Sequence, residues 1–516
     1  SGGSASDSQI RSTIANRLAA TINGTTAAAA LVTAASSGEQ VTLTGTSSAS
    51  YTLAAAASNG SGVGVSSTTN QSSYPGKAAS EFSNAYAFAA LKTDGSVVTW
   101  GSETYGGTVP EDKKQLLSEG VVQIFSSEGA FAALKADGSV VTWGHSSWGS
   151  NSDSVKDQLT SGVSQIHSTR TTFLAIKQDG TVVLWGNGAI PNSSYFNNRI
   201  TSGGGVKSVA SGYFGFAIVL NNNSAICTQS IDTTTQSTLS SGVKEVFAND
   251  YAYGAIKDDG RVVTWGSSAD FGGTINPITA SKLSTNVIKV FASKYAFAAL
   301  KVDGSVVTWG HPDYGGDSSS VATSLQSNIV KIVSNGYAFA AIKDNGSVIT
   351  WGNASQGGDS SSVASLLQSD VSTITTNGTA FAAIKKDGSV VAWGNQYGGG
   401  RLTDAAAVSV AEKVNSNVVN IIGTLGYGDF AALKNDGSVV TWGAYSSSNT
   451  AINNVLQLYA NYNSFAAIKT DGTVQTWGNP WNGGNSASVS NQLFNVVSIA
   501  NPFTDDKLVA LGADNS

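Results

Sequence analysis

Three histidines, His145, His167 and His311, are the side chains best suited to acid–base or metal chemistry near neutral pH. His145 and His311 each follow a Trp-Gly pair, and His167 lies in an alternating apolar segment. No Ser–His–Asp set, HExxH motif, CxxC pair or phosphate-binding glycine loop stands at an informative spacing. The sequence therefore predicts no catalytic or histidine-based metal site, and a protein that is not an enzyme.

A second set of polar residues is a series of aspartates that each precede a glycine. Their repetition favours turn chemistry and pairing with the lysine two residues earlier, because a calcium site needs several oxygens that converge on one point. Two Gly-Gly-Asp-Ser-Ser-Ser segments, Gly315–Ser320 and Gly357–Ser362, are better calcium candidates. We predict no cofactor, with calcium at these segments as the alternative. The turn aspartates are Asp94, Asp137, Asp179, Asp259, Asp303, Asp387, Asp436 and Asp471.

A third set consists of single aromatic residues, each in a variable segment after a Trp-Gly pair. If the repeats superpose, these aromatics lie on one face. Each then packs on its own glycine-rich loop, or together they form an exposed array suited to contact with a protein or glycan. These candidate partner-binding residues are Tyr105, Trp148, Phe271, Tyr314, Tyr397, Tyr445 and Trp481.

The element that positions all of these residues is a repeat, first seen at Ala87–Gly101 as AFAALKTDGSVVTWG. Its tryptophans recur about every 42 residues, which is typical of propeller blades. Close copies occupy Ala130–Gly144, Ala296–Gly310, Ala338–Gly352, Ala380–Gly394 and Asp429–Gly443. Looser copies end at Trp185, Trp265 and Trp477, and an eroded copy at Phe216–Thr228 has Thr228 in the tryptophan's place.

Each unit has the pattern of three strands. An alternating apolar strand such as Val122–Phe125 precedes Phe-Ala-Ala-Leu-Lys, and a two-residue Asp-Gly turn of type I′ leads into Ser-Val-Val-Thr-Trp. The variable segment that follows is a helical turn or an irregular outer strand. The sequence predicts an all-β fold: a β-propeller of about 42-residue blades, with ten hairpins, a terminal half-unit and a short N-terminal helical extension.

Residues 1–80 lack the repeat, so we predict an N-terminal extension there and a propeller over residues 81–516. Ser6–Ile22 carries an apolar stripe on a short helix, which packs on the repeats or docks on another subunit. A second segment alternates like a strand, and Ala54–Lys77 is rich in Gly, Ser and Thr, as in a linker. The candidate assembly and closure residues are Ile10, Ile14 and Leu18 in the helix, and Gln40, Val41, Thr42, Leu43 and Thr44 in the strand.

The last unit, Lys507–Ser516, stops at its turn and lacks a third strand. If Gln40–Thr44 supplies the missing strand, the ring has eleven units or splits into two smaller rings. If a neighbouring molecule supplies it, the chains link into filaments.

Composition limits the compartment and the partners. Only 12% of residues are charged, the net charge is −6, and no basic patch favours nucleic acid. One cysteine, Cys227, excludes an intramolecular disulfide, and methionine is absent even at position 1, as after cleavage of a signal peptide. No apolar run reaches the ~18 residues that a membrane span needs. We expect an extracellular or cell-surface protein.

The segment from Ala90 to Gly101 resembles the repeat of the regulator-of-chromosome-condensation family of β-propellers, ALxxDGxVxxWGxNxxGQLG, and Tyr105-Gly106-Gly107 stands at its Gly-Gln. The shorter period, seen over Thr108–Gly144, is still more similar to the secreted bacterial β-lactamase-inhibitory propellers of that superfamily. The resemblance covers roughly residues 81–516. It implies a propeller, usually of seven blades, that binds a protein through one face.

Two functions remain open. The first is a non-enzymatic extracellular assembly protein, such as a surface-layer, sheath or filament subunit, with itself as the partner. It is favoured by the low charge, the unfinished last unit and the N-terminal extension. The alternative is a secreted inhibitor or adhesin that binds an extracellular protein or glycan through its aromatic face. Guanine-nucleotide exchange, as in the founding family, is disfavoured because no basic tail is present.

Overall fold

The computed structural model describes residues 83–187, 193–229, 231–402, 408–426, 428–444 and 451–500, and four strands between residues 32 and 67. The chain divides into two compact units, Ser1–Ser73 and Tyr74–Ser516. No helix in the described part of the chain is long and apolar enough to cross a membrane.

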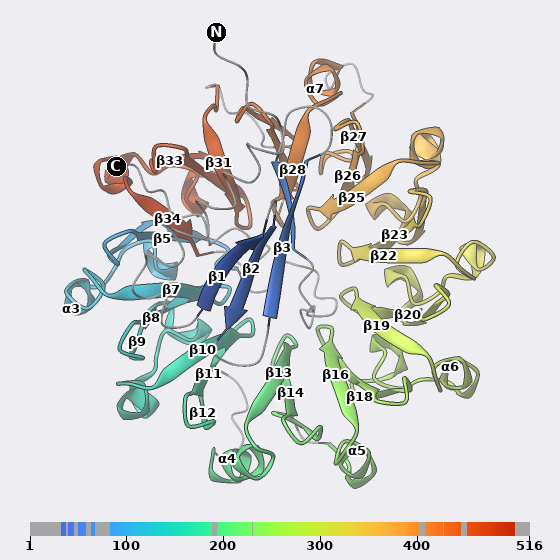
Figure 1. Cartoon of the computed structure of the whole chain (residues 1–516), viewed down its shortest axis with the longest axis horizontal. Coiled ribbons are helices and arrows are strands. Elements are labelled where there is room, and N and C mark those ends of the chain that lie inside the picture. Colours follow the sequence, from blue (N-terminus) through green and yellow to red (C-terminus); the bar gives the residue numbers. More distant parts are fainter. Residues whose placement is uncertain are drawn as a thin grey trace. The chain divides into compact units, whose positions relative to one another are not determined.

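The second unit is a ring of blades, each an antiparallel sheet of three strands (Figure 1). Ten such sheets lie within the described residues, and in nine of them the first strands of neighbouring blades contact one another in sequence. The second strand is central in every sheet. The all-β propeller predicted from the repeat is therefore confirmed, as a single ring of ten blades.

Blades are numbered here from the one that contains β5. The first strands of blades 1 to 10 are β34 (Val496–Ile499), β7 (Val121–Ser126), β10 (Val163–Ser168), β13 (Val206–Ser211), β16 (Val243–Ala248), β19 (Val287–Ala292), β22 (Ile329–Ser334), β25 (Val371–Thr376), β28 (Val418–Gly423) and β31 (Val455–Ala460). The second strands are β5 (Ala87–Lys92), β8 (Ala130–Lys135), β11 (Thr172–Lys177), β14 (Phe216–Leu220), β17 (Ala252–Lys257), β20 (Ala296–Lys301), β23 (Ala338–Lys343), β26 (Ala380–Lys385), β29 (Phe430–Lys434) and β32 (Ser464–Lys469). The third strands are β6 (Val97–Gly101), β9 (Val140–Gly144), β12 (Val182–Gly186), β15 (Ala225–Cys227), β18 (Val262–Gly266), β21 (Val306–Gly310), β24 (Val348–Gly352), β27 (Val390–Gly394), β30 (Val439–Trp442) and β33 (Val474–Gly478).

Within the described residues, short helices and not an outer strand lie in every connection between blades except that between blades 9 and 10, and the longer ones lie at the outer rim (Figure 1). The α-helices are α3 (Glu111–Lys114), α4 (Ser193–Ser202), α5 (Thr233–Thr238), α6 (Pro277–Lys282) and α7 (Val408–Lys413). The 3₁₀ helices are η1 (Glu103–Tyr105), η2 (Ser146–Trp148), η3 (Asp153–Gln158), η4 (Ala269–Phe271), η5 (Pro312–Tyr314), η6 (Ser319–Val321), η7 (Ala354–Gln356), η8 (Ser361–Leu367), η9 (Pro480–Asn482) and η10 (Ala487–Gln492).

Each hydrophobic core lies between two neighbouring blades. Along β8, Ala130, Ala132 and Leu134 pack on blade 3, while Phe131 and Ala133 alternate with them and pack on blade 1. Both faces of a second strand are therefore buried, which explains why its pattern is continuously apolar. The alanines let the sheets approach closely, and the aromatic rings fill the remaining space.

A tryptophan latch joins consecutive blades. Trp143 on β9 stacks on Phe131 with ring centroids 5.2 Å apart, and its Nε1 donates to the carbonyl of Gly106 at 3.1 Å. Gly106 has a φ of 98° and ends η1, the first connection after blade 1. A Cβ at Gly106 would lie 2.8 Å from the Phe131 ring, so this close approach requires glycine.

The hairpin turn differs from the predicted type I′ turn. Only Gly138 of the Ala136-Asp137-Gly138 loop has a positive φ, 78°, and Lys135 donates its N–H to Ser139 O at 2.9 Å. The loop thus has three residues, with glycine in the left-handed position, as in a type I turn followed by a bulge. Asp137 stays at negative φ because its carboxylate accepts hydrogen bonds from Ser139 N and Oγ, at 2.9 and 2.6 Å.

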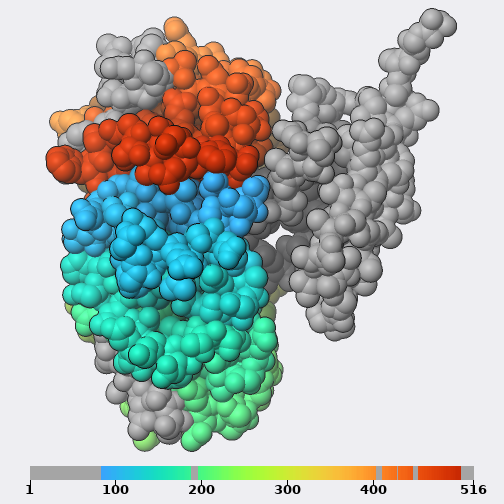
Figure 2. All heavy atoms as spheres, turned by 90° about the vertical axis from the view of Figure 1, so that its left-hand side faces the viewer, coloured from blue at the N-terminus to red at the C-terminus, as the bar shows by residue number. Residues whose placement is uncertain are grey.

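The last described strand closes the ring. The strand β34 pairs with β5 through Val496↔Lys92 and Ile499↔Ala90, so the first strand of blade 1 comes from the last repeat. Figure 2 shows this red end of the chain against the blue start of the propeller. Blade 1 is therefore complete within the chain.

The predicted closing strand Gln40–Thr44 was wrong. It belongs to β2 (Gln40–Gly45), which pairs on one edge with β1 (Val32–Ser37) and on the other with β3 (Ser50–Ala57), so neither edge is free for a blade. The linker prediction was also wrong in part, because β3 and β4 (Val63–Ser67) pair within Ala54–Lys77. The predicted helix with Ile10, Ile14 and Leu18, and the half-unit Lys507–Ser516, lie outside the described residues.

Candidate functional site: the central turns and their aromatic arc

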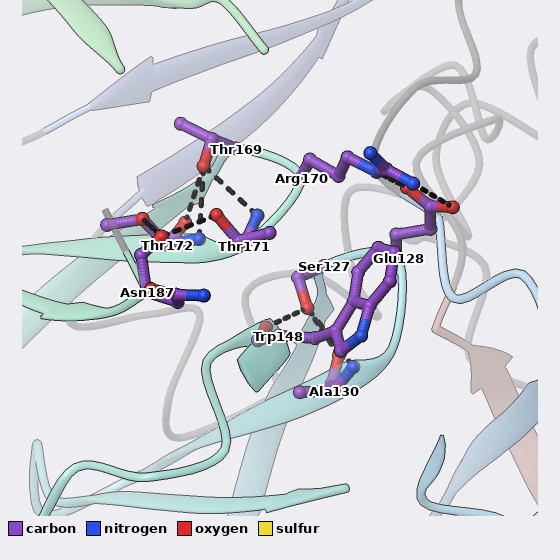
Figure 3. Close-up of polar contacts among 9 residues, drawn as sticks. All are labelled: Ser127, Glu128, Ala130, Trp148, Thr169, Arg170, Thr171, Thr172 and Asn187. Carbon is purple, nitrogen blue, oxygen red and sulfur yellow. Dashed lines mark hydrogen bonds and ion pairs between the residues drawn. The ribbon is translucent and has the colours of Figure 1, made fainter. Parts of the chain in front are cut away.

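The first strand of each blade points to the ring's centre and the second strand returns outward, so the turns between them surround the axis (Figure 1). In seven of the blades the turn begins with a Ser or Asn whose side chain links it to the loop behind the third strand. Ser127 Oγ accepts from Ala130 N at 3.1 Å and donates to Trp148 O at 2.6 Å (Figure 3). In blade 7, Asn335 accepts from Ala338 N and donates to Gln356 O. This bond fixes each variable loop beside a central turn.

Backbone hydrogen bonds also join the turns of neighbouring blades. The N–H of Glu128 donates to Arg170 O at 3.2 Å, and that of Lys294 donates to Gly336 O at 3.0 Å. Such bonds are formed only when adjacent turns keep the same height along the axis. They make a rigid collar that holds the turn side chains in place.

Arg170 joins three other side chains at this collar. It forms an ion pair with Glu128, in which Nη2 also donates to Oε1 at 3.3 Å (Figure 3). Its guanidinium lies 4.6 Å from the ring centroids of both Trp148 and Tyr213. Arginine suits this place because a planar cation can stack on two aromatic rings while it pairs with a carboxylate.

Aromatic rings contact one another around the collar from blade 1 to blade 7. Tyr86 and Tyr105 lie 4.2 Å apart at one end, and Tyr314 and Tyr337 lie 5.3 Å apart at the other. Arg170 bridges the interval in blade 3. We call this set the aromatic arc; its members are Tyr86, Tyr105, Trp148, Tyr213, Phe214, Tyr251, Phe271, Tyr295, Tyr314 and Tyr337.

The inner turns line a partly open central cavity of about 270 Å³. Four charged residues line it: Glu128, Arg170, Asp250 and Lys294. Lys294 Nζ lies 4.7 Å from the ring centroid of Tyr337, and 3.3 Å from its hydroxyl. The opposite blades contribute small and uncharged groups, and the full lining is Ser83, Ala85, Glu128, Arg170, Tyr213, Asp250, Lys294, Asn335, Gly336, Tyr337, Gly378, Thr379, Leu425, Gly426 and Tyr462.

The structure places the predicted partner-binding aromatics in two groups. Tyr105, Trp148, Phe271 and Tyr314 are half-buried members of the arc. Tyr397 and Trp481 are 74% and 84% exposed. Tyr445 lies outside the described residues.

The histidines and aspartates singled out in the sequence shape local structure. The Nδ1 atoms of His145 and His311 accept from Ser147 N and Asp313 N, both at 3.2 Å, and so cap η2 and η5. Asp317 and Asp359, in the two calcium candidates, each accept a backbone N–H two residues later at 2.8 Å. These bonds, with the following serine hydroxyls, lower the pKa of both carboxyls. No cluster of three metal-ligating side chains occurs among the described residues.

The turn aspartates lie at the outer rim and act mainly within their own turns. Among the described lysines two residues before a turn aspartate, only Lys92 forms an ion pair with that aspartate, which is Asp94, at 3.8 Å. Other lysines at this position, such as Lys135, donate instead to a carbonyl at the end of the preceding helical segment, here Leu116 O at 2.8 Å. The predicted lysine–aspartate pairing thus holds in blade 1, and in five other blades the lysine caps a helical segment instead.

Sequence reasoning missed the charged residues of the collar. Glu128, Arg170, Asp250 and Lys294 occupy the same turn position in different blades, between two well-matched strands. The available signal was a charged residue at this one position of four repeats, between two strands whose pattern recurs. The tyrosines just before several second strands, such as Tyr295 and Tyr337, were a second signal.

No protein-family model matches the chain, and no curated protein matches it. Among solved structures it is similar to Prp20p from Saccharomyces cerevisiae, studied for binding to Gsp1p and histones, at 14% identity over 78% of this chain and 83% of that one, with a TM-score of 0.29. It is also similar to the CRINKLY WD40 ectodomain of the Arabidopsis thaliana receptor kinase ACR4, at 17% identity over 52% and 95%, with a TM-score of 0.29. A third is the C-terminal domain of gp131 from bacteriophage phiKZ, at 11% identity over 72% and 94%, with a TM-score of 0.31.

The closer likeness to β-lactamase-inhibitory propellers stays a prediction. The three-stranded blades show a β-propeller fold, and the repeat resembles that of the regulator-of-chromosome-condensation family.

Proposed function

We propose that this chain is a non-enzymatic binding propeller whose binding surface is the aromatic arc and the central cavity. The observation that carries the proposal is the continuity of the arc, in which aromatic rings from six blades, bridged by Arg170 in blade 3, lie around one rigid collar. Aromatic and arginine side chains are the usual anchors of interfaces. Low charge and the lack of methionine support an extracellular or cell-surface site of action.

The ring's closure also favours binding over assembly by strand donation. Because β34 completes blade 1 within the chain, the blade needs no strand from a neighbour. The partner is then a separate extracellular protein or glycan. No cofactor is needed for this role.

The assembly function keeps one specific observation in its favour. A bulge after the first residue of each first strand leaves the second residue unpaired, as in the shift between Val121 and Gln123. Six of these bulge residues are exposed aliphatics: Val122, Ile288, Val330, Val419, Leu456 and Val497. Bulges blunt sheet edges, whereas exposed aliphatics favour contact with other molecules. A surface-layer or filament role through this edge is the second candidate.

The test compares two surface substitutions. Phe214, an arc member, is 49% exposed, and Ile278, on α6 at the outer rim, is 73% exposed. Labelled wild-type chain, Phe214→Ala and Ile278→Ala are titrated onto cells and secreted material of the source culture. We expect Phe214→Ala to weaken binding about tenfold, while Ile278→Ala leaves it unchanged. Equal binding by all three chains would overturn the proposal.

A further inference from the structure

We propose that the central cavity binds a neutral, hydroxyl-rich saccharide. The inference rests on the proposed binding function and specifies its ligand. Four properties of the cavity lead to it. The charges of its lining cancel, its charged side chains already have contacts within the protein, tyrosine rings line it, and a buried hydroxyl in it has no protein partner.

The charges of the lining cancel. Glu128 and Asp250 supply two carboxylates, and Arg170 and Lys294 supply two cations. A charged ligand would gain attraction from one pair and repulsion from the other, so the lining as a whole gives it no Coulombic advantage. Balanced charge therefore favours a neutral ligand.

These ions already have protein contacts. Arg170 pairs with Glu128 and stacks between two rings, and Lys294 lies against Tyr337. An anion or cation would have to compete with these contacts. A hydroxyl can instead donate to a remaining carboxylate lone pair, or accept from a remaining guanidinium N–H, without breaking the pair.

Tyrosines of three blades line the cavity: Tyr213, Tyr337 and Tyr462, of which Tyr462 is 41% exposed. A tyrosine offers an apolar face beside a polar hydroxyl, which suits the alternating C–H and O–H surface of a sugar ring.

Ser83 provides a further polar contact for the ligand. It lines the cavity, is only 3% exposed, and its Oγ has no hydrogen-bond partner among the described residues. Leaving a buried hydroxyl unpaired costs free energy, which a ligand hydroxyl in the cavity would recover. The volume of about 270 Å³ is just below the usual range for small-ligand sites, roughly 300–1,000 Å³, so the ligand is short or enters by one end.

The experiment uses the full chain and two exposed aromatics as a matched pair. Tyr462 lines the cavity, whereas Trp481, on η9, is 84% exposed and does not line it. Binding of short neutral gluco-, galacto- and manno-oligosaccharides is measured by calorimetry, with oligogalacturonates as the charged comparison. We expect a neutral oligosaccharide to bind, Tyr462→Ala to weaken it about tenfold, and Trp481→Ala to leave it unchanged.

Thermal unfolding of Tyr462→Ala checks that the chain is folded, and Tyr462→Phe, which keeps the ring, is expected to retain most of the affinity. If saccharide affinity fell with Trp481→Ala and not with Tyr462→Ala, the proposed location of the binding site would be overturned. If oligogalacturonates bound more tightly than neutral oligosaccharides, the proposed ligand class would be overturned. Failure of every saccharide, together with Phe214-dependent binding of a protein, would overturn this inference and leave the proposed function standing.

Discussion

Gly106→Ala is expected to destabilise the propeller strongly, because Gly106 lies where one blade is latched to the next. A side chain at its φ of 98° costs about 1–2 kcal/mol in backbone strain. The new Cβ would also lie 2.8 Å from Phe131 Cδ2, and overpacking of a core costs about 1–3 kcal/mol. Movement to relieve the overlap would weaken the hydrogen bond from Trp143. The expected loss of unfolding free energy is about 3 kcal/mol or more.

The chain provides a matched control at Gly120, just before β7. Its φ is 73°, but a Cβ there would meet only the flexible end of Lys135, at 3.3 Å. Other blades have Asn at the same position with positive φ, as Asn286 and Asn328 show. We therefore expect Gly120→Ala to cost about 1–2 kcal/mol and Gly120→Asn to cost less than about 1 kcal/mol.

Guanidinium unfolding followed by tryptophan fluorescence measures these differences as shifts in midpoint. All three variants are compared in one buffer, so that any departure from two-state behaviour in the repeat array affects them alike. If Gly106→Ala lowered the unfolding free energy no more than Gly120→Ala does, the proposed role of the tryptophan latch would be refuted.

Glu245→Gln is expected to stabilise the chain at pH 8 by up to about 3 kcal/mol, because burial raises the pKa of Glu245 to about 7. The folded state then binds the proton more tightly than the unfolded state does. The stability of the wild-type chain therefore falls as pH rises from about 4.5 to 7. Guanidinium midpoints from pH 5 to pH 8 should be flatter for the variant, and an unchanged slope would contradict this. Asp137→Ala is expected to cost less than about 1 kcal/mol at pH 7, since the hydrogen bonds from Ser139 lower the pKa of Asp137 in an exposed turn. The loss of unfolding free energy should vanish as pH falls through the pKa of Asp137 in the folded chain. A loss that persists at pH 2 would be the contrary result. Arg170→Lys keeps the charge but loses the planar double stack, so we expect it to cost about 1–3 kcal/mol in the same unfolding assay, with wild-type stability as the contradicting outcome.

The sequence predicted the blades well because their determinants are local. Asp137-Gly138 between alternating segments marks a hairpin, and the period of Trp100 and Trp143 marks the blade. The turn type was missed because the side chain of Asp137 stabilises its own negative φ, an interaction that the Asp-Gly pair alone does not reveal.

Ring closure could not be settled from the sequence in the same way. The pairing of Val496 with Lys92 joins residues far apart in the chain, and local pattern does not select one strand partner over another. One signal was available: Val496–Ile499 has the first-strand pattern, and the hairpin at Ala87–Gly101 lacks a first strand of its own.

The aromatic candidates were chosen from the sequence as matching positions of repeated loops, but the contacts of those that the structure describes depend on residues elsewhere. Trp148 belongs to the arc because Arg170, from the next blade, bridges it to Tyr213. Trp481 and Tyr397 extend from the surface instead. Such differences depend on contacts between side chains of neighbouring blades, and the sequence of a single repeat does not reveal those contacts.

The measurement that tests the central claim most directly is the mass of the native chain in solution, by light scattering, with and without residues 1–73. A ring closed by β34 and built for binding a separate partner predicts a monomer in both cases, with the same unfolding midpoint for the propeller. A polymer that dissolves on deletion would contradict this account and establish assembly as the function.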